Sequence, residues 1–196
     1  MIPVENIAAI LLCAGSSRRH PSGCKLMRFL DGRPLVAHAA TLLAELPFKN
    51  LVAVVPPEPV NEPLHRLLGE LGFALAINER PEQGQDSSVR IGLAAARHSD
   101  PDAFLICLGD MPHIESAHLH ALATAATAER PTASGGDNWL SPPVLFPRGY
   151  YTTLVGEDRS PRDILARDVA VVAAAPRLLT DFDLPTDFEA VGEKAA

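Results

Sequence analysis

The sequence has few cysteines. Its three cysteines, Cys13, Cys24 and Cys107, form no C-x-x-C pair, and an odd number provides neither a disulfide framework nor a zinc site. Cys13 and Cys107 each end an apolar run, a pattern that predicts small buried core residues. This cysteine usage favours a reducing, cytoplasmic setting.

A long apolar segment is also lacking. The longest unbroken run, Ile7–Ala14, has eight residues, whereas a membrane-spanning helix needs roughly 18 or more. No basic segment precedes this run, so a secretory signal is not predicted. The chain also has less positive than negative charge, with 17 Lys and Arg against 24 Asp and Glu and a net charge of −7. An acidic chain is not expected to bind nucleic acid or membrane surfaces in general.

The composition is that of a folded protein. Hydrophobic residues make up 47% of the 196 residues and charged residues 21%, which suits a globular chain with a real core. No internal repeat or clear linker divides it, so a single domain over residues 1–196 is predicted. The 18 prolines are an excess and are expected in loops, at helix starts and on edge strands.

Apolar runs and helical patterns alternate along the first 128 residues. The runs are continuous rather than alternating, which indicates strands covered on both faces, as in a parallel sheet. Between them, apolar residues recur at spacings of three and four, as in amphipathic helices. The order predicts a Rossmann-like, three-layer α/β/α fold with a mostly parallel, doubly wound sheet. The expected strands are Ile7–Ala14, Leu51–Val55, Phe73–Ile77 and Ala103–Leu108; the expected helices are Leu35–Leu46, Leu64–Leu71, a segment capped by Asp86 or Ser87 and running to Ala96, and Glu115–Ala128.

The pattern weakens after residue 128. Residues 134–138 form a turn cluster, and the prolines of Ser141–Pro147 fit an edge strand or a loop. Ser160 followed by Pro161 predicts a capped helix start. Val169–Ala175 is the last expected strand.

Ligands of open α/β sheets bind beyond the carboxyl ends of the strands, and the loop after the first strand is basic. Gly15 permits a tight turn, and its neighbours Ser16 and Ser17 offer backbone N–H groups to an anion. Arg18, Arg19, Lys25, Arg28 and Arg33 outweigh Asp31, so residues 18–33 carry a net charge of +4. A polyphosphate site would explain this charge, and a solvated basic loop is the alternative. The loop lacks G-x-G-x-x-G and G-x-x-x-x-G-K-[ST], so neither an NAD(P) oxidoreductase nor a P-loop NTPase is favoured.

Acidic residues follow the fourth strand and recur near the C-terminus. Asp110 stands at the carboxyl end of that strand, where it could hold Mg²⁺ that bridges substrate phosphates. Its alternative role is to cap a helix near Ile114. Asp183 in the turn Asp181–Asp187 could be a second metal ligand, although a terminal acidic turn is usually structural. Gly84, Ser87 and Ser88 could face a planar base, or belong to an ordinary capped loop.

Taken together, these segments resemble the MobA-like nucleotidyltransferase family, which makes molybdenum-cofactor dinucleotides. The matches run in family order from about residue 7 to residue 190. They are Leu12-Cys-Ala-Gly15 with Ser17, Arg19 and Lys25; Gly84-Gln-Asp-Ser-Ser88 with Gly92-Leu93; Gly109-Asp-Met-Pro112; Pro143-Val-Leu-Phe146; Asp158–Leu165; and Asp181–Asp187.

The resemblance implies a Mg²⁺-dependent transfer of a nucleotidyl group from CTP or GTP to the terminal phosphate of molybdopterin. It implies that Lys25, Arg19 and Asp110 are catalytic, and that Asp110 and Asp183 hold the metal. The implied nucleotide-binding residues are Leu12, Ala14, Gly15, Ser16, Ser17, Arg18, Gly84, Ser87 and Ser88.

The family pattern favours cytidine. Ala14-Gly15 resembles the cytidylyl-transferring branch, whereas the guanylyl-transferring branch usually has two glycines there. His20-Pro21 and Ser160-Pro161 depart from the pattern, which leaves room for another phosphorylated acceptor, such as a sugar phosphate or methylerythritol phosphate. A non-catalytic nucleotide-binding accessory protein is the alternative of another class, and a molybdoenzyme or its chaperone is a candidate partner.

Overall fold

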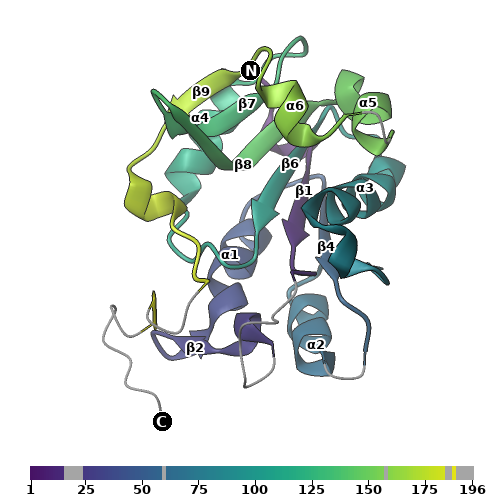
Figure 1. Cartoon of the computed structure of the whole chain (residues 1–196), viewed down its shortest axis with the longest axis vertical. Coiled ribbons are helices and arrows are strands. Elements are labelled where there is room, and N and C mark those ends of the chain that lie inside the picture. Colours follow the sequence, from purple (N-terminus) through teal and green to yellow (C-terminus); the bar gives the residue numbers. More distant parts are fainter. Residues whose placement is uncertain (16–23, 59–60, 157–158, 184–186, 189–196) are drawn as a thin grey trace.

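The computed structural model describes residues 1–15, 24–58, 61–156, 159–183 and 187–188. Across these residues, seven strands form one sheet in the order β5-β4-β1-β6-β8-β7-β9 (Figure 1). The strands are β1 (Ile7–Leu12), β4 (Asn50–Val55), β5 (Ala74–Ile77), β6 (Ala103–Leu108), β7 (Thr132–Gly136), β8 (Trp139–Pro147) and β9 (Ala170–Ala173). A separate hairpin pairs β2 (Phe29–Leu30) with β3 (Arg33–Pro34).

The sheet is mostly parallel. β1 pairs in parallel with β4 and β6, and β4 with β5. β8 is antiparallel to both β6 and β7, so it is the one reversed strand of this sheet, and β7 pairs in parallel with β9. The chain moves outward from β1 through β4 to β5 and then returns to the other side of β1 with β6. This reversal between β1 and β6 is where open α/β sheets place their ligands.

Helices cover both faces of the sheet, which confirms the predicted fold class (Figure 1). α1 (Leu35–Ala44), α2 (Glu62–Glu70) and α4 (Ser116–Ala125) contribute to one buried core. α3 (Gln85–Ala96), α5 (Tyr151–Val155) and α6 (Pro161–Leu165) contribute to the other. All six residues of β1 are buried, and alternate residues belong to opposite cores. This burial on both faces explains why the sequence of β1 is apolar throughout. None of the helices in the described ranges has the length and apolarity needed to span a membrane.

Two predictions for the segment after residue 128 were wrong. Ser141–Pro147 is neither edge strand nor loop but part of the interior strand β8. The register of β7 and β8 shifts between Ala133, opposite Val144, and Ser134, opposite Ser141. Pro142 and Pro143 fall within this irregularity, so their missing N–H donors interrupt no regular pairing. In addition, residues 134–136 belong to β7, and the turn is confined to residues 137–138.

The starts of two helices, α3 and α4, also differ from prediction, and the start of α6 agrees with it. Gly84, with φ +91°, precedes α3 in place of Asp86 or Ser87. Asp110 does not cap α4, which begins at Ser116. Ser160 does cap α6, because its side chain accepts a hydrogen bond from the Asp163 N–H while the Asp163 carboxylate accepts one from the Ser160 N–H.

Candidate active site

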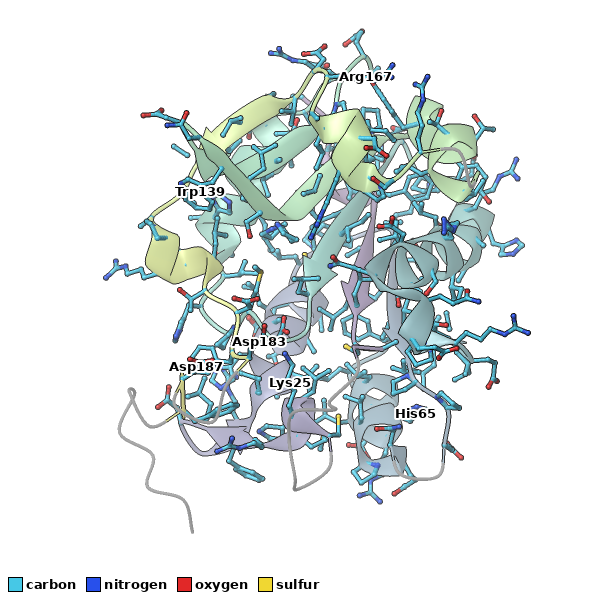
Figure 2. The ribbon with its side chains drawn as sticks, viewed as in Figure 1. Lys25, His65, Trp139, Arg167, Asp183 and Asp187 are labelled. Atoms are coloured by element: carbon cyan, nitrogen blue, oxygen red, sulfur yellow. The ribbon has the colours of Figure 1, made fainter. Side chains whose placement is uncertain are left out.

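Lys25 lies between two carboxylates at the β1–β6 reversal (Figure 2). Its Nζ donates to Asp110 Oδ2 at 2.7 Å and to Asp183 Oδ1 at 2.6 Å. Lys25 begins a short 3-10 helix, Lys25–Met27, and Asp110 follows β6. The side chains of Lys25 and Asp110 are mostly buried, and that of Asp183 is half exposed. The structure therefore brings together three of the predicted site residues, two of them 158 positions apart in the chain.

Close packing of β6 against β1 positions Asp110. The Gly109 N–H donates to the Leu12 carbonyl at 3.0 Å, which joins the ends of the two strands. A Cβ at Gly109 would lie 2.9 Å from Cys13 Sγ, closer than side chains pack, so this approach requires glycine. Asp110 consequently stands beside the start of the basic loop.

The C-terminal segment reaches Asp110 through backbone and aromatic contacts. The Phe182 N–H donates to the Asp110 carbonyl at 3.0 Å. The Phe182 ring packs edge-on against the buried Phe188 ring, with centroids 5.3 Å apart, and the Arg28 guanidinium lies 4.0 Å above the Phe188 ring. These contacts fix the chain on both sides of Asp183.

The charges of the cluster affect one another. Burial lowers the pKa of Lys25, but the carboxylates of Asp110 and Asp183 raise it by more, so the pKa lies above its ordinary value. Burial raises the pKa of nearby Asp181, and the negative charges of Asp110 and Asp183 add to this effect. Lys25 therefore remains protonated at neutral pH, as a group that binds phosphate oxygens must be.

The carboxylates fit a magnesium ion. Asp110 Oδ1 is buried and accepts no hydrogen bond from the described part of the chain, so one hard oxygen ligand is available. No group of three or more ligating side chains gathers among the described residues. A cation held by Asp110 and Asp183 would complete its coordination with water and substrate phosphates, which is how Mg²⁺ usually binds.

The structure separates the members of the other predicted loop. Gly84 is exposed at the start of α3, whereas Ser87 and Ser88 are buried. Both hydroxyls accept hydrogen bonds from Asn78 Nδ2, at 3.0 and 2.9 Å. Sequence reasoning did not single out Asn78, although it directly follows β5 and Asp110 was noticed because it lies just after β6.

Three of the remaining predicted residues lie in or just after β1. Leu12 and Ala14 are buried and Gly15 is exposed. Ser16, Ser17, Arg18 and Arg19 lie outside the described residues.

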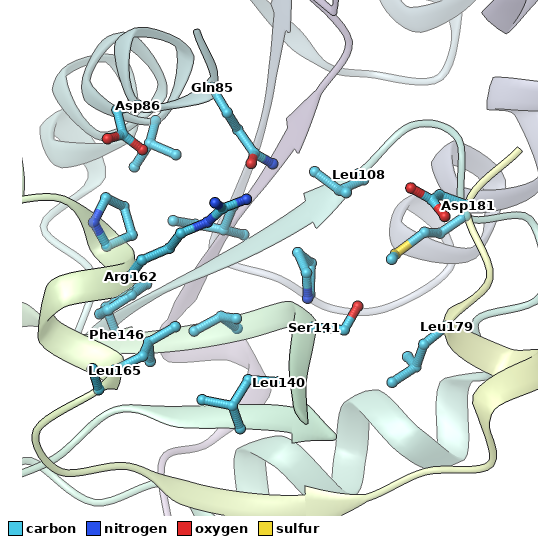
Figure 3. A pocket seen from close by; sticks show the side chains of 17 residues that line it. Gln85, Asp86, Leu108, Leu140, Ser141, Phe146, Arg162, Leu165, Leu179 and Asp181 are labelled. Atoms are coloured by element: carbon cyan, nitrogen blue, oxygen red, sulfur yellow. The ribbon is translucent and has the colours of Figure 1, made fainter. Parts of the chain in front are cut away.

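A cavity of about 500 Å³ opens next to Lys25, Asp110 and Asp183 and lies between α3, β8 and α6 (Figure 3). Much of its wall is apolar, including Val89, Leu108 and Val144. Arg162 points into it from α6, toward Gln85 at the start of α3 (Figure 3). Sequence reasoning did not place Arg162 in the site.

The mostly parallel seven-stranded sheet with helices on both faces is the fold of solved nucleotidyltransferases. The family model described as "MobA-like NTP transferase domain" matches residues 9–177. The chain belongs to the MobA-like NTP transferase family.

Curated relatives include other nucleotidyltransferases. The "Bifunctional protein GlmU" of Rhodococcus jostii is 31% identical over 152 residues, which cover 76% of this chain and 30% of that protein. The "2-C-methyl-D-erythritol 4-phosphate cytidylyltransferase" of Dehalococcoides mccartyi is 34% identical over 93 residues, 46% of this chain and 40% of that one. The matched region thus spans less than half of either relative.

Solved structures share the fold. Rv0371c from Mycobacterium tuberculosis superposes with a TM-score of 0.80 at 18% identity, covering 97% of this chain and 100% of that one. A further structure of that protein, described as a complex with manganese, gives a TM-score of 0.76 at 17% identity, covering 95% of this chain and 97% of that chain.

Proposed function

We propose that this protein transfers CMP from CTP to the terminal phosphate of molybdopterin and releases pyrophosphate. The observation that carries the proposal is Lys25 held between Asp110 and Asp183 at the β1–β6 reversal. A cation and two carboxylates at this place suit a triphosphate, since the carboxylates would hold Mg²⁺ and the cation would face the reacting phosphate.

The chemistry requires charge neutralisation and alignment. An oxygen of the acceptor phosphate forms a bond to the α-phosphorus of CTP, and the bond from that phosphorus to the oxygen bridging the β-phosphate breaks, so pyrophosphate leaves. The attacking oxygen is already anionic, so no strong general base is needed. Lys25 would leave its carboxylates to contact the α-phosphate, and Arg19 and Arg18 would bind the leaving phosphates.

The backbone around Gly15, from Leu12 and Ala14 to Ser16 and Ser17, would hold the triphosphate. When bound, Mg²⁺ supplies a Lewis acid that neutralises phosphate charge.

The cavity supports an acceptor with a flat organic body. Its apolar residues Val89, Leu108 and Val144 would pack against a ring system. Gln85, Ser141 and Asp181 offer hydrogen-bond partners to the polar atoms of that ring system. Arg162 would bind an acidic group of the acceptor. Molybdopterin has both parts, a ring system and a terminal phosphate.

A cytidylyltransferase among the relatives supports cytidine as the base, as does the Ala14-Gly15 pair, and GTP is the second candidate nucleotide.

Pyrophosphate release tests the proposal. The purified protein is supplied with Mg²⁺ and CTP or GTP, and with molybdopterin, 2-C-methyl-D-erythritol 4-phosphate or a sugar 1-phosphate as acceptor. We expect release with CTP and molybdopterin. Lys25→Ala should lower kcat by about 10²- to 10³-fold, the effect of removing one group that stabilises a developing negative charge. Asp110→Asn should lower kcat comparably.

Lys49 and Asp102 serve as matched controls. Both lie at the opposite end of the sheet, where Lys49 Nζ donates to the Asp100 carbonyl and Asp102 accepts from Asn6. Lys49→Ala and Asp102→Asn should remain within twofold of the unaltered protein. Nucleotide binding without pyrophosphate release for any acceptor would instead indicate the accessory protein. Near-normal turnover in Lys25→Ala and Asp110→Asn would contradict the catalytic assignment.

A further inference from the structure

Asn78 occupies a rigid position at the carboxyl end of β5. Its backbone N–H donates to the Val55 carbonyl of β4 at 2.8 Å, and its side chain is 1% exposed. The Oδ1 atom accepts the Arg80 N–H at 2.9 Å, so Nδ2 must face the other way, toward the two serines. The orientation of the side-chain amide is therefore determined by its partners.

Both hydrogens of this amide are used within the protein. One points to Ser87 Oγ and the other to Ser88 Oγ, in the first turn of α3. Ser87 Oγ in turn donates to the Gly84 carbonyl at 2.8 Å. Asn78 thus joins the sheet to α3 and, through Ser87, to the exposed Gly84.

These bonds decide which groups of the loop can reach a ligand. The Ser87 hydroxyl accepts from Asn78 and donates to Gly84, so it is not available to a base, and the buried Ser88 hydroxyl accepts from Asn78. Gly84 and Gln85 are exposed, so their backbone groups lie open to a base, whereas the Gln85 side chain points into the cavity proposed for the acceptor (Figure 3). Gly84 has φ +91°, which other residues rarely adopt. Its carbonyl accepts both the Ser87 hydroxyl at 2.8 Å and the Ser87 N–H at 3.2 Å, so its direction depends on Ser87.

We propose that Asn78 is a positioning residue for nucleotide recognition, whose buried amide holds the segment Gly84–Ser88 in the arrangement that discriminates between nucleobases. The inference rests on the proposed function, because it takes this segment as the part of the site nearest the base. Asn78 itself does not touch the nucleotide; it acts through Ser87 and Gly84.

Asn78→Asp is the sharpest perturbation because it preserves shape. An aspartate can still accept from the Arg80 N–H, but it cannot donate to the serines. The Ser87 hydroxyl hydrogen already goes to Gly84, so two oxygen atoms would then face each other without a hydrogen between them. Ser87→Ala removes one bond of the same network with a smaller disturbance, and it serves where Asn78→Asp folds poorly.

The experiment measures dissociation constants for CTP and GTP by calorimetry, with Mg²⁺ and without acceptor. We expect the unaltered protein to distinguish the two nucleotides. Asn78→Asp should weaken binding of the preferred nucleotide by tenfold or more and reduce the CTP-to-GTP affinity ratio at least threefold. Ser87→Ala should change both quantities in the same direction by less.

Asn6→Asp is the matched control. Asn6 Nδ2 also bridges two segments, through Asp102 Oδ2 at 2.9 Å, but at the opposite end of the sheet. This variant is expected to lower thermal stability and to keep both affinities within twofold. The comparison separates loss of stability from loss of base discrimination.

Each result has a distinct meaning. If the unaltered protein binds neither nucleotide, the proposed function fails, and the role of Asn78 fails with it. If the unaltered protein binds nucleotide, and Asn78→Asp and Ser87→Ala have the same affinities and the same CTP-to-GTP ratio, only the role of Asn78 is overturned. Weaker binding with an unchanged ratio, or an unaltered protein with no preference, also overturns base discrimination through Asn78.

Discussion

Replacing Gly109 with alanine should displace Asp110 from the cluster. The added Cβ would lie 2.9 Å from Cys13 Sγ and 3.4 Å from both the Leu12 carbonyl oxygen and Leu26 Cδ1. Cys13 and Leu26 are buried, and the Gly109 N–H is bonded to Leu12 at 3.0 Å. The strain must therefore move the chain at the end of β6, where Asp110 follows directly.

The structure sets the size of the effect. Inserting a methyl group into a close-packed core costs about 1–3 kcal/mol of unfolding free energy. A misplacement of about 1 Å in a catalytic group can lower turnover by about 10²-fold. The shift that relieves the 2.9 Å contact with Cys13 Sγ is smaller than about 1 Å, so we expect kcat/KM for pyrophosphate release to fall by about tenfold. Urea unfolding and the pyrophosphate assay measure the two quantities.

A second substitution tests whether the contact with Cys13 causes these effects. Cys13→Ala removes the sulfur atom that the new methyl group meets, so Cys13→Ala/Gly109→Ala should recover about 1 kcal/mol relative to additive single effects. Gly69→Ala in α2 is the control, because a Cβ there meets nothing within 4 Å. Equal stability and activity in Gly109→Ala, or strictly additive effects in the double variant, would refute the close-packing account.

Two further predictions concern pH and thiol chemistry. Burial lowers the pKa of His118 below its ordinary value of 6.5, so the unfolded chain takes up this proton at higher pH than the folded chain. Unfolding free energy should therefore fall as pH drops below about 6.5. His118→Gln should flatten that slope in urea unfolding, whereas exposed His98→Gln should not; an unchanged slope in the first contradicts the account. Burial also raises the pKa of the Cys13 and Cys107 thiols, so iodoacetamide should add once to the native protein, at half-buried Cys24. Two or three adducts in the intact mass would be inconsistent with the buried thiols.

The sheet was predictable because its strands are buried on both faces. An apolar run such as Ala103–Leu108 needs no periodicity to be recognised, and its bounds were confirmed. Strand β8 was harder, because Pro142 and Pro143 argue locally against an interior position. They are accommodated by the shift in register between β7 and β8. Such a shift depends on how two strands pair, so it cannot be predicted from the sequence of one strand.

The candidate site was predictable only in part. Rules for strand ends pointed to Lys25 and Asp110. The acidic turn suggested Asp183 only as one alternative, which the family resemblance then favoured, because its contact with Lys25 spans 158 positions. The sequence drew attention to the serines after Gly84, but their hydrogen bonds to Asn78 depend on the tertiary structure. Arg162 enters the cavity through the packing of α6, which the sequence of that helix does not encode by itself.

The late position of Asp183 also matters while the protein is being made. Translation proceeds from the N-terminus, so a ribosome completes Lys25, Asp110 and every strand of the sheet before Asp183 emerges. A nascent chain could fold its sheet while still lacking the second carboxylate beside Lys25. The contact of Lys25 with Asp183 would then form only once Phe182 and Phe188 dock, after the strands of the sheet have been made.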